Sequence, residues 1–145
     1  METVAAALSQ TVDHAAERGV VLCMETHDDW CDPSHAAAVL SRVDHPAVAA
    51  NWDIMHPVRT GAATMTSAFR TLWPYIGHVH VHDGKTQDAK LVLVPIGSGD
   101  IDHRDGLSLL RDAEYGGFIS GEWIDWEPWE VHLPREQDTL KRFEG

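Results

Sequence analysis

The sequence has little positive charge. Lys and Arg number 11 against 23 Asp and Glu, which gives a formal net charge of −12 at pH 7. A protein that binds nucleic acid or an anionic membrane surface needs clustered basic side chains to neutralise phosphates. The chain offers no such cluster, so we predict that it binds neither nucleic acid nor a membrane.

Long hydrophobic runs and cysteines are also scarce. The apolar run at residues 20–24 is far too short to span a bilayer, and no signal-peptide pattern follows Met1. The two cysteines, Cys23 and Cys31, form neither a disulfide framework nor a CxxC pair, which is typical of a reducing cytoplasm. A hydrophobic content of 43% over 145 residues is ordinary for a globular protein, so we expect one cytoplasmic domain over residues 1–145.

Helix-like and strand-like segments alternate along the chain. Apolar residues at helical spacing predict helices over residues 3–18, 33–42, 64–73, 103–113 and 133–143. Short β-rich runs predict strands over residues 20–25, 47–53, 76–83 and 118–124, and residues 84–102 are expected to be irregular. Such alternation requires a parallel sheet with right-handed crossovers, so the predicted fold class is α/β.

A titratable residue of interest stands near the carboxyl end of each predicted strand. These residues are Glu25, Asp53, His80 and Glu122. Parallel α/β proteins build their active sites at the carboxyl ends of the strands, so three carboxylates and an imidazole are expected to meet there. Because side chains alternate along a strand, the residues that share a face with these four are mostly small or polar, and the residues on the other face are apolar. This distribution is typical of the wall of a barrel.

Five motifs in this sequence resemble, in order and near spacing, those of the xylose isomerase-like barrels. They are METH, NWDIMHP, GHVHVHD, PIGSGDID and YGGFISGEW. This family includes sugar isomerases, ketose 3-epimerases, inosose dehydratase and the apurinic-site endonucleases. The resemblance implies that Glu25, Asp53, His80 and Glu122 bind one divalent metal ion and that His56 contacts the substrate.

Two departures from the family pattern matter. The endonuclease branch holds three zinc ions and uses an Asp-x-His pair after the third motif, which residues 84–102 lack, so DNA cleavage is disfavoured. A complete barrel has eight strands and about 250 residues. The chain is therefore expected to be a C-terminal half barrel of about four βα units. Because its open edges invite pairing, the expected partner is the missing N-terminal half barrel or a second copy.

The expected chemistry follows from the oxygen-rich ligand set. Such a set suits Mn²⁺, Mg²⁺ or Co²⁺ better than a thiolate-loving metal, and Zn²⁺ also fits. The resemblance implies an isomerase or epimerase of sugars or sugar phosphates, in which Glu25 and Glu122 move a proton next to a ketose carbonyl through an enediolate. His27, two residues after Glu25, and Lys85, after the third strand, are further candidates for substrate binding.

Other interpretations stay open at this point. A related inosose dehydratase fits the same motifs, and a non-catalytic half barrel would retain the ligand residues only as a metal-binding or assembly fragment. His78 and His82 are expected to be hydrogen-bonded supports rather than ligands. Trp123, Trp126 and Trp129 either line a sugar pocket or simply pack. The remaining histidines are expected at the surface or at helix caps: His14, His35, His45, His103 and His132.

Overall fold

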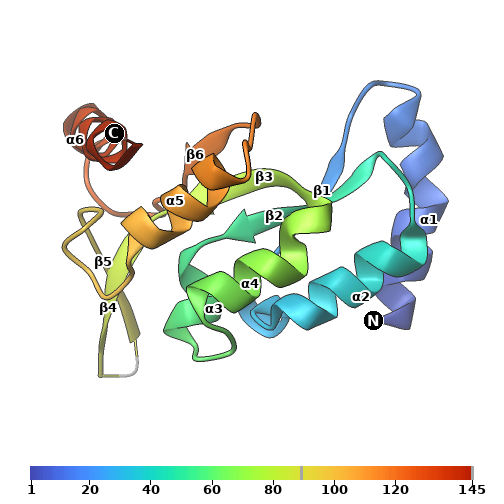
Figure 1. Cartoon of the computed structure of the whole chain (residues 1–145), viewed down its shortest axis with the longest axis horizontal. Helices are drawn as coiled ribbons and strands as arrows, with labels where there is room; N and C mark the ends of the chain where they lie inside the picture. Colours follow the sequence, from blue (N-terminus) through green and yellow to red (C-terminus); the bar gives the residue numbers. More distant parts are fainter. Residues whose placement is uncertain (89, 145) are drawn as a thin grey trace.

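The centre of the protein is a four-stranded parallel sheet (Figure 1). The computed structural model describes residues 1–88 and 90–144. Its strands are β1 (Leu22–Glu25), β2 (Val48–Asp53), β3 (Ile76–Val81) and β6 (Ile119–Gly121), in the spatial order β1-β2-β3-β6. All three pairings are parallel, which confirms the predicted α/β class.

Three helices lie in one row, and two more stand at the two ends of this row (Figure 1). The helices are α1 (Glu2–Ala16), α2 (Pro33–Val43), the short α3 (Met55–Arg59), α4 (Met65–Leu72), α5 (His103–Asp112) and α6 (Trp129–Glu144). Asp32, Thr64 and Asp102 cap α2, α4 and α5 by accepting hydrogen bonds from backbone N–H groups of the first turn. Helices α2, α4 and α5 follow one another along one side of the sheet, between α1 and α6.

The hydrophobic core lies between this row of helices and one face of the sheet. Trp52, Val79 and Val81 point from the strands into it and are fully buried, with Leu72 of α4 packed in the same cluster. On the opposite face Cys23 is exposed and the His80 side chain is partly exposed. The structure therefore has the predicted division into an apolar face under helices and a polar, open face.

The segment expected to be irregular contains a β-hairpin. Strands β4 (Asp83–Gln87) and β5 (Lys90–Val94) pair antiparallel directly after β3. The last helix also begins earlier than predicted, at Trp129, because the carbonyl of Pro128 already accepts the N–H groups of Val131 and His132. The fourth strand is shorter than predicted, at Ile119–Gly121.

Two histidines expected at the surface or at helix caps are buried. His103, at the start of α5, is 1% exposed, and its Nε2 lies 3.0 Å from the carbonyl oxygen of His82. His132 of α6 is 5% exposed and packs edge-on against Trp123 at 4.8 Å between ring centroids. Trp123 also stacks with Trp126 at 6.3 Å, so these two indoles pack against each other and against α6.

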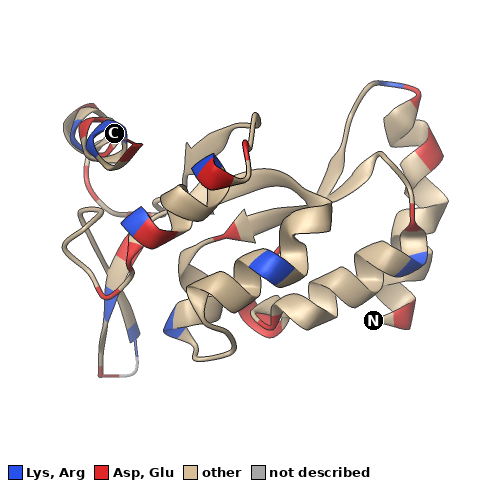
Figure 2. Cartoon of the chain, in the orientation of Figure 1, with Lys and Arg blue, Asp and Glu red and all other residues tan. Residues whose placement is uncertain are grey.

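The distribution of charge agrees with the composition. Figure 2 shows Lys and Arg scattered over several elements, without a continuous basic face. Among the described residues, no helix is both long enough and apolar enough to cross a membrane.

Candidate active site

Four side chains from four strands converge at the carboxyl end of the sheet. Glu25, Asp53, His80 and Glu122 each offer one ligand atom, and these atoms all lie within 4.8 Å of one another. The Nδ1 atom of His80 is 2.8 Å from Oε1 of Glu25 and 3.5 Å from Oε2 of Glu122. Glu25 ends β1 and Glu122 follows β6, so residues from both outer strands reach the imidazole of β3, one of the two inner strands.

Asp53 is held rigidly and is the most deeply buried member of this group. Its Oδ1 accepts hydrogen bonds from the backbone N–H groups of Met55 (2.8 Å) and His56 (3.0 Å). The hydroxyl of Thr26 accepts from the Asp53 N–H at 3.0 Å and donates to its carbonyl oxygen at 3.3 Å. Oδ2 has no hydrogen-bond partner, although the side chain is fully buried. This leaves one carboxylate oxygen without a hydrogen bond, near Nδ1 of His82 and beside the other acidic groups.

The electrostatics of the group favour a cation. The pKa of Asp53 is raised to about 8, mainly by burial; the N–H groups of His56 and Met55 oppose the rise, and the charges of Glu25 and Glu122 add to it. A divalent ion among three carboxylates and one imidazole would offset this repulsion. Oxygen-rich sets of this kind suit Mn²⁺, Mg²⁺ or Co²⁺, and Zn²⁺ also accepts them. The residues present therefore fit the metal that the sequence motifs imply.

Three histidines extend the site away from the carboxylates. The ring of His56 lies 4.1 Å from that of His27 and 5.0 Å from that of His82, between centroids. Nδ1 of His82 is 3.3 Å from Oδ2 of Asp53. Burial is the main cause that lowers the pKa of His56 to about 4 and that of His82 to about 3, and nearby basic side chains add smaller effects. Both rings are therefore neutral at pH 7, and each offers one N–H donor and one nitrogen acceptor.

His82 was not among the residues that the sequence indicated for the site. It lies in the cavity, and with Asp53 and His56 it forms a second group of three potential ligands. The period-two spacing of His78, His80 and His82 placed all three on one face, but that spacing does not say which ring reaches the carboxyl end. His78 lies nearer the amino end of β3, where its Nε2 is 2.9 Å from the hydroxyl oxygen of Ser120.

The structure does not bring Lys85 to the other site residues. Lys85 lies on β4 opposite Val92, and both side chains are exposed. Leu91 and Leu93 of the same hairpin line the cavity instead, together with His27, His56, His82, Glu122 and Ile124. The cavity has a volume of about 220 Å³. His27 and His56 are thus adjacent to the four converging side chains, whereas Lys85 is not.

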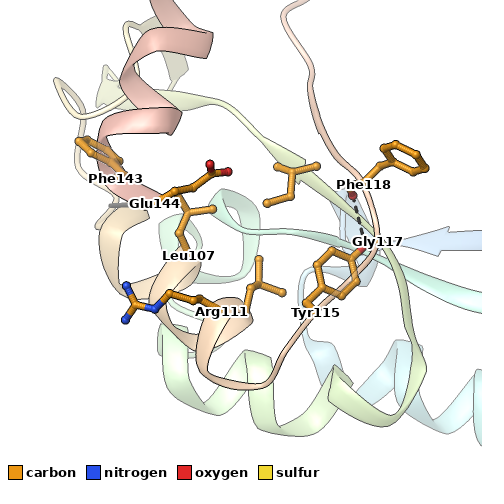
Figure 3. A pocket seen from close by; sticks show the side chains of 9 residues that line it. Leu107, Arg111, Tyr115, Gly117, Phe118, Phe143 and Glu144 are labelled. Carbon is orange, nitrogen blue, oxygen red and sulfur yellow. Dashed lines mark hydrogen bonds between the residues drawn. The ribbon is translucent and has the colours of Figure 1, made fainter.

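A separate cavity lies on the helix side of β6 (Figure 3). It has a volume of about 430 Å³ and is lined mainly by apolar side chains, including Leu107, Tyr115, Phe118 and Phe143. The hydroxyl of Tyr115 donates to the carbonyl oxygen of Phe118 at 3.2 Å. This cavity adjoins an outer strand of the sheet and contains none of the converging carboxylates.

Comparisons with known proteins agree with the fold of the sheet and its helices. The family described as Xylose isomerase-like TIM barrel matches residues 1–143. A putative hydroxypyruvate isomerase of Danio rerio is 29% identical over 92 residues, which are 63% of this chain and 31% of that protein.

Solved structures show the same fold. A probable 3-DHS dehydratase from Bacillus anthracis has a TM-score of 0.80 at 21% identity, over 94% of this chain and 55% of that chain. A D-allulose 3-epimerase from Methylomonas sp. has a TM-score of 0.80 at 17% identity, over 96% and 54%. The chain spans about half the length of these structures and about a third of the Danio rerio protein. Since the family match covers nearly all of the described residues, the chain belongs to the xylose isomerase-like TIM barrel family.

Proposed function

We propose that this chain is the metal-holding half of a divalent-metal-dependent isomerase or epimerase that acts on a sugar or sugar phosphate. The observation that carries the proposal is the convergence of Glu25, Asp53, His80 and Glu122, whose ligand atoms lie within 4.8 Å of one another. These four residues would hold Mn²⁺, Mg²⁺ or Co²⁺. When bound, such an ion supplies a Lewis acid that polarises a substrate carbonyl.

The two glutamates are the proposed proton-transfer groups. Their side chains are 28% and 31% exposed on the open face of the sheet, whereas the Asp53 side chain is fully buried and out of reach of a substrate. One glutamate removes the proton from the carbon next to the ketose carbonyl, which forms an enediolate. The other returns a proton. Return to the opposite face of the same carbon gives an epimer, and return to the neighbouring carbon gives an isomer.

His56 and His27 are the proposed substrate-binding residues. His56 is neutral at pH 7 because burial lowers its pKa to about 4, so its ring can donate to a substrate oxygen without adding charge. His27, whose side chain is 38% exposed, lies against His56 at the open side of the site. Together they would orient the carbonyl and a neighbouring hydroxyl toward the glutamates.

Solvent exchange of the substrate α-proton tests this proposal. In deuterated water with Mn²⁺, we expect ketoses to gain deuterium at the carbon next to the carbonyl, and Glu122→Gln or Glu25→Gln to abolish the labelling. Glu130→Gln, on the exposed part of α6, is the matched control that leaves labelling intact. Labelling that persists in both active-site variants would show that neither glutamate is the base.

We also propose that a second half barrel completes the site. Strands β1 and β6 end the sheet on either side, and apolar residues near these edges are exposed, with Val21 at 49% and Phe118 at 82%. Four further βα units would cover them and enclose the substrate. The partner is an N-terminal half barrel or a second copy of this chain. If labelling fails even when such a half is supplied, the alternative of a non-catalytic half barrel holds.

The two cysteines, neither of which is in a disulfide, support a cytoplasmic location for this assembly.

A further inference from the structure

The cavity beside the carboxylates has two chemically different sides. His27, His56, His82 and Glu122 give it a polar floor, and Leu91, Leu93 and Ile124 give it an apolar wall. None of the described residues that line it is Lys or Arg. A ligand in this space therefore meets hydrogen-bonding groups at one end and hydrocarbon at the other.

The apolar wall comes largely from one face of the β4–β5 hairpin. In its antiparallel register Leu93 lies opposite Gly84, and Lys85 lies opposite Val92. Paired residues share a face and successive residues alternate, so the leucines face the cavity while Lys85 and Val92 face away from it. Lys90 of β5 is on the same face as Val92, so both lysines of the hairpin strands are turned from the ligand space.

A buried carboxylate fixes the base of this hairpin. Asp83 is fully buried, and its Oδ1 accepts the N–H of Gly84 at 2.8 Å. Its Oδ2 accepts the N–H groups of Gly97 and Gly99, both at 2.9 Å. Leu91 packs closely over Gly84, where a side chain on the glycine would collide with it. These contacts fix the position of the hairpin. We therefore expect it to stay in place when a polar group of a ligand lies against it, so that water cannot reach that group.

We infer that the β4–β5 hairpin is a specificity wall that selects an uncharged substrate, with a methyl or other deoxygenated carbon at the end facing Leu93. A hydroxyl pressed against this wall loses hydrogen bonds to water without gaining a partner. A phosphate loses more, and it also meets the negative charge of Glu122. The inference rests on the proposed function, because the wall belongs to the same cavity, and it narrows the substrate class to non-phosphorylated compounds.

Three small ketones test the wall directly. Hydroxyacetone, dihydroxyacetone and dihydroxyacetone phosphate share a carbonyl and a hydroxyl and differ at the far end, which is a methyl, a hydroxymethyl or a phosphate ester. Their affinities for the Mg²⁺-loaded chain are measured by ligand-observed NMR, and Mg²⁺ binding is measured separately by calorimetry. We expect hydroxyacetone to bind at least about tenfold more tightly than the phosphate ester.

Two arginine variants on neighbouring positions locate the effect. Leu93→Arg places a cation on the inner face of the hairpin and should tighten binding of the phosphate ester by about tenfold or more. Val92→Arg adds the same charge on the outer face and should leave that affinity within about twofold, since exposed charges are screened. Both variants should bind Mg²⁺ as the unmodified chain does.

The outcomes separate the inference from the proposed function. If the unmodified chain does not bind Mg²⁺, both fail. If it binds Mg²⁺ but binds no ketone, the proposed function and the specificity wall both fail. If it binds the phosphate ester as tightly as hydroxyacetone, the specificity wall alone is overturned. If Leu93→Arg and Val92→Arg increase the affinity for the phosphate ester equally, the specificity wall is also overturned, because the increase would then come from long-range electrostatic attraction.

Discussion

Metal binding should displace a proton from Asp53. In the metal-free chain burial and the neighbouring glutamates raise the pKa of Asp53 to about 8. At pH 7 a group with this pKa is about 0.9 protonated, and at pH 9 it is about 0.1 protonated. A cation requires the ionised carboxylate, so binding should release about 0.9 proton at pH 7 and about 0.1 at pH 9. The same competition should make the apparent metal affinity about tenfold weaker at pH 7 than at pH 9.

Calorimetry in two buffers that differ in their enthalpy of ionisation measures this release. The difference in the heat of Mn²⁺ binding between the buffers gives the number of protons released per ion bound. Asp112→Asn, at the exposed end of α5, is the control, because it removes one negative charge that is not among the converging side chains and should leave the release unchanged. A release that is near zero at pH 7, or that does not fall between pH 7 and pH 9, would refute the protonated state of Asp53.

Three further perturbations give measurable outcomes. The folded chain binds the proton of Asp53 more tightly than the unfolded chain does, and it binds the protons of His56 and His82 more weakly. These three groups therefore make the metal-free chain most stable near the ordinary histidine pKa of about 6.5. In urea melts, the free energy of unfolding should decrease as the pH is lowered from about 6.5. It should also decrease by about 2 kcal/mol as the pH is raised from about 6.5 to 8, and saturating Mn²⁺ should remove this second decrease. Thr26→Val leaves the buried N–H of Asp53 unpaired and should lower the free energy of unfolding by about 1–3 kcal/mol in the same melts. Thr11→Val, on the exposed face of α1, should lower it far less, and equal decreases would contradict the role of Thr26. Light scattering should show the isolated chain self-associating through its open edges, and a monodisperse monomer with a cooperative melt would contradict that expectation.

Local patterns in the sequence carry much of the information about the fold and the site. Alternating helices and strands predict a parallel sheet, and period two along each strand predicts which face is open. Glu25, Asp53, His80 and Glu122 could be assigned to one place because each stands near the carboxyl end of its own strand. The family match over residues 1–143 supports the same architecture.

Features that depend on contacts between distant segments were not evident from the sequence. The burial of His103 depends on the carbonyl of His82, which lies 21 residues earlier in the chain, and no pattern around His103 indicates that contact. The β4–β5 hairpin depends on Asp83, which binds N–H groups of the glycine-rich segment that follows it. Those glycines indicated an irregular loop, although they allow the close approach that orders the hairpin base.

The central claim is that Glu25, Asp53, His80 and Glu122 bind one divalent cation. Anomalous diffraction at the manganese edge, from crystals of the chain grown with Mn²⁺, tests it most directly. We expect one peak within ordinary ligand distance of all four side chains, and no such peak in crystals of Asp53→Ala. A peak bound instead by Asp53, His56 and His82, or no peak at the carboxyl end of the sheet, would contradict it.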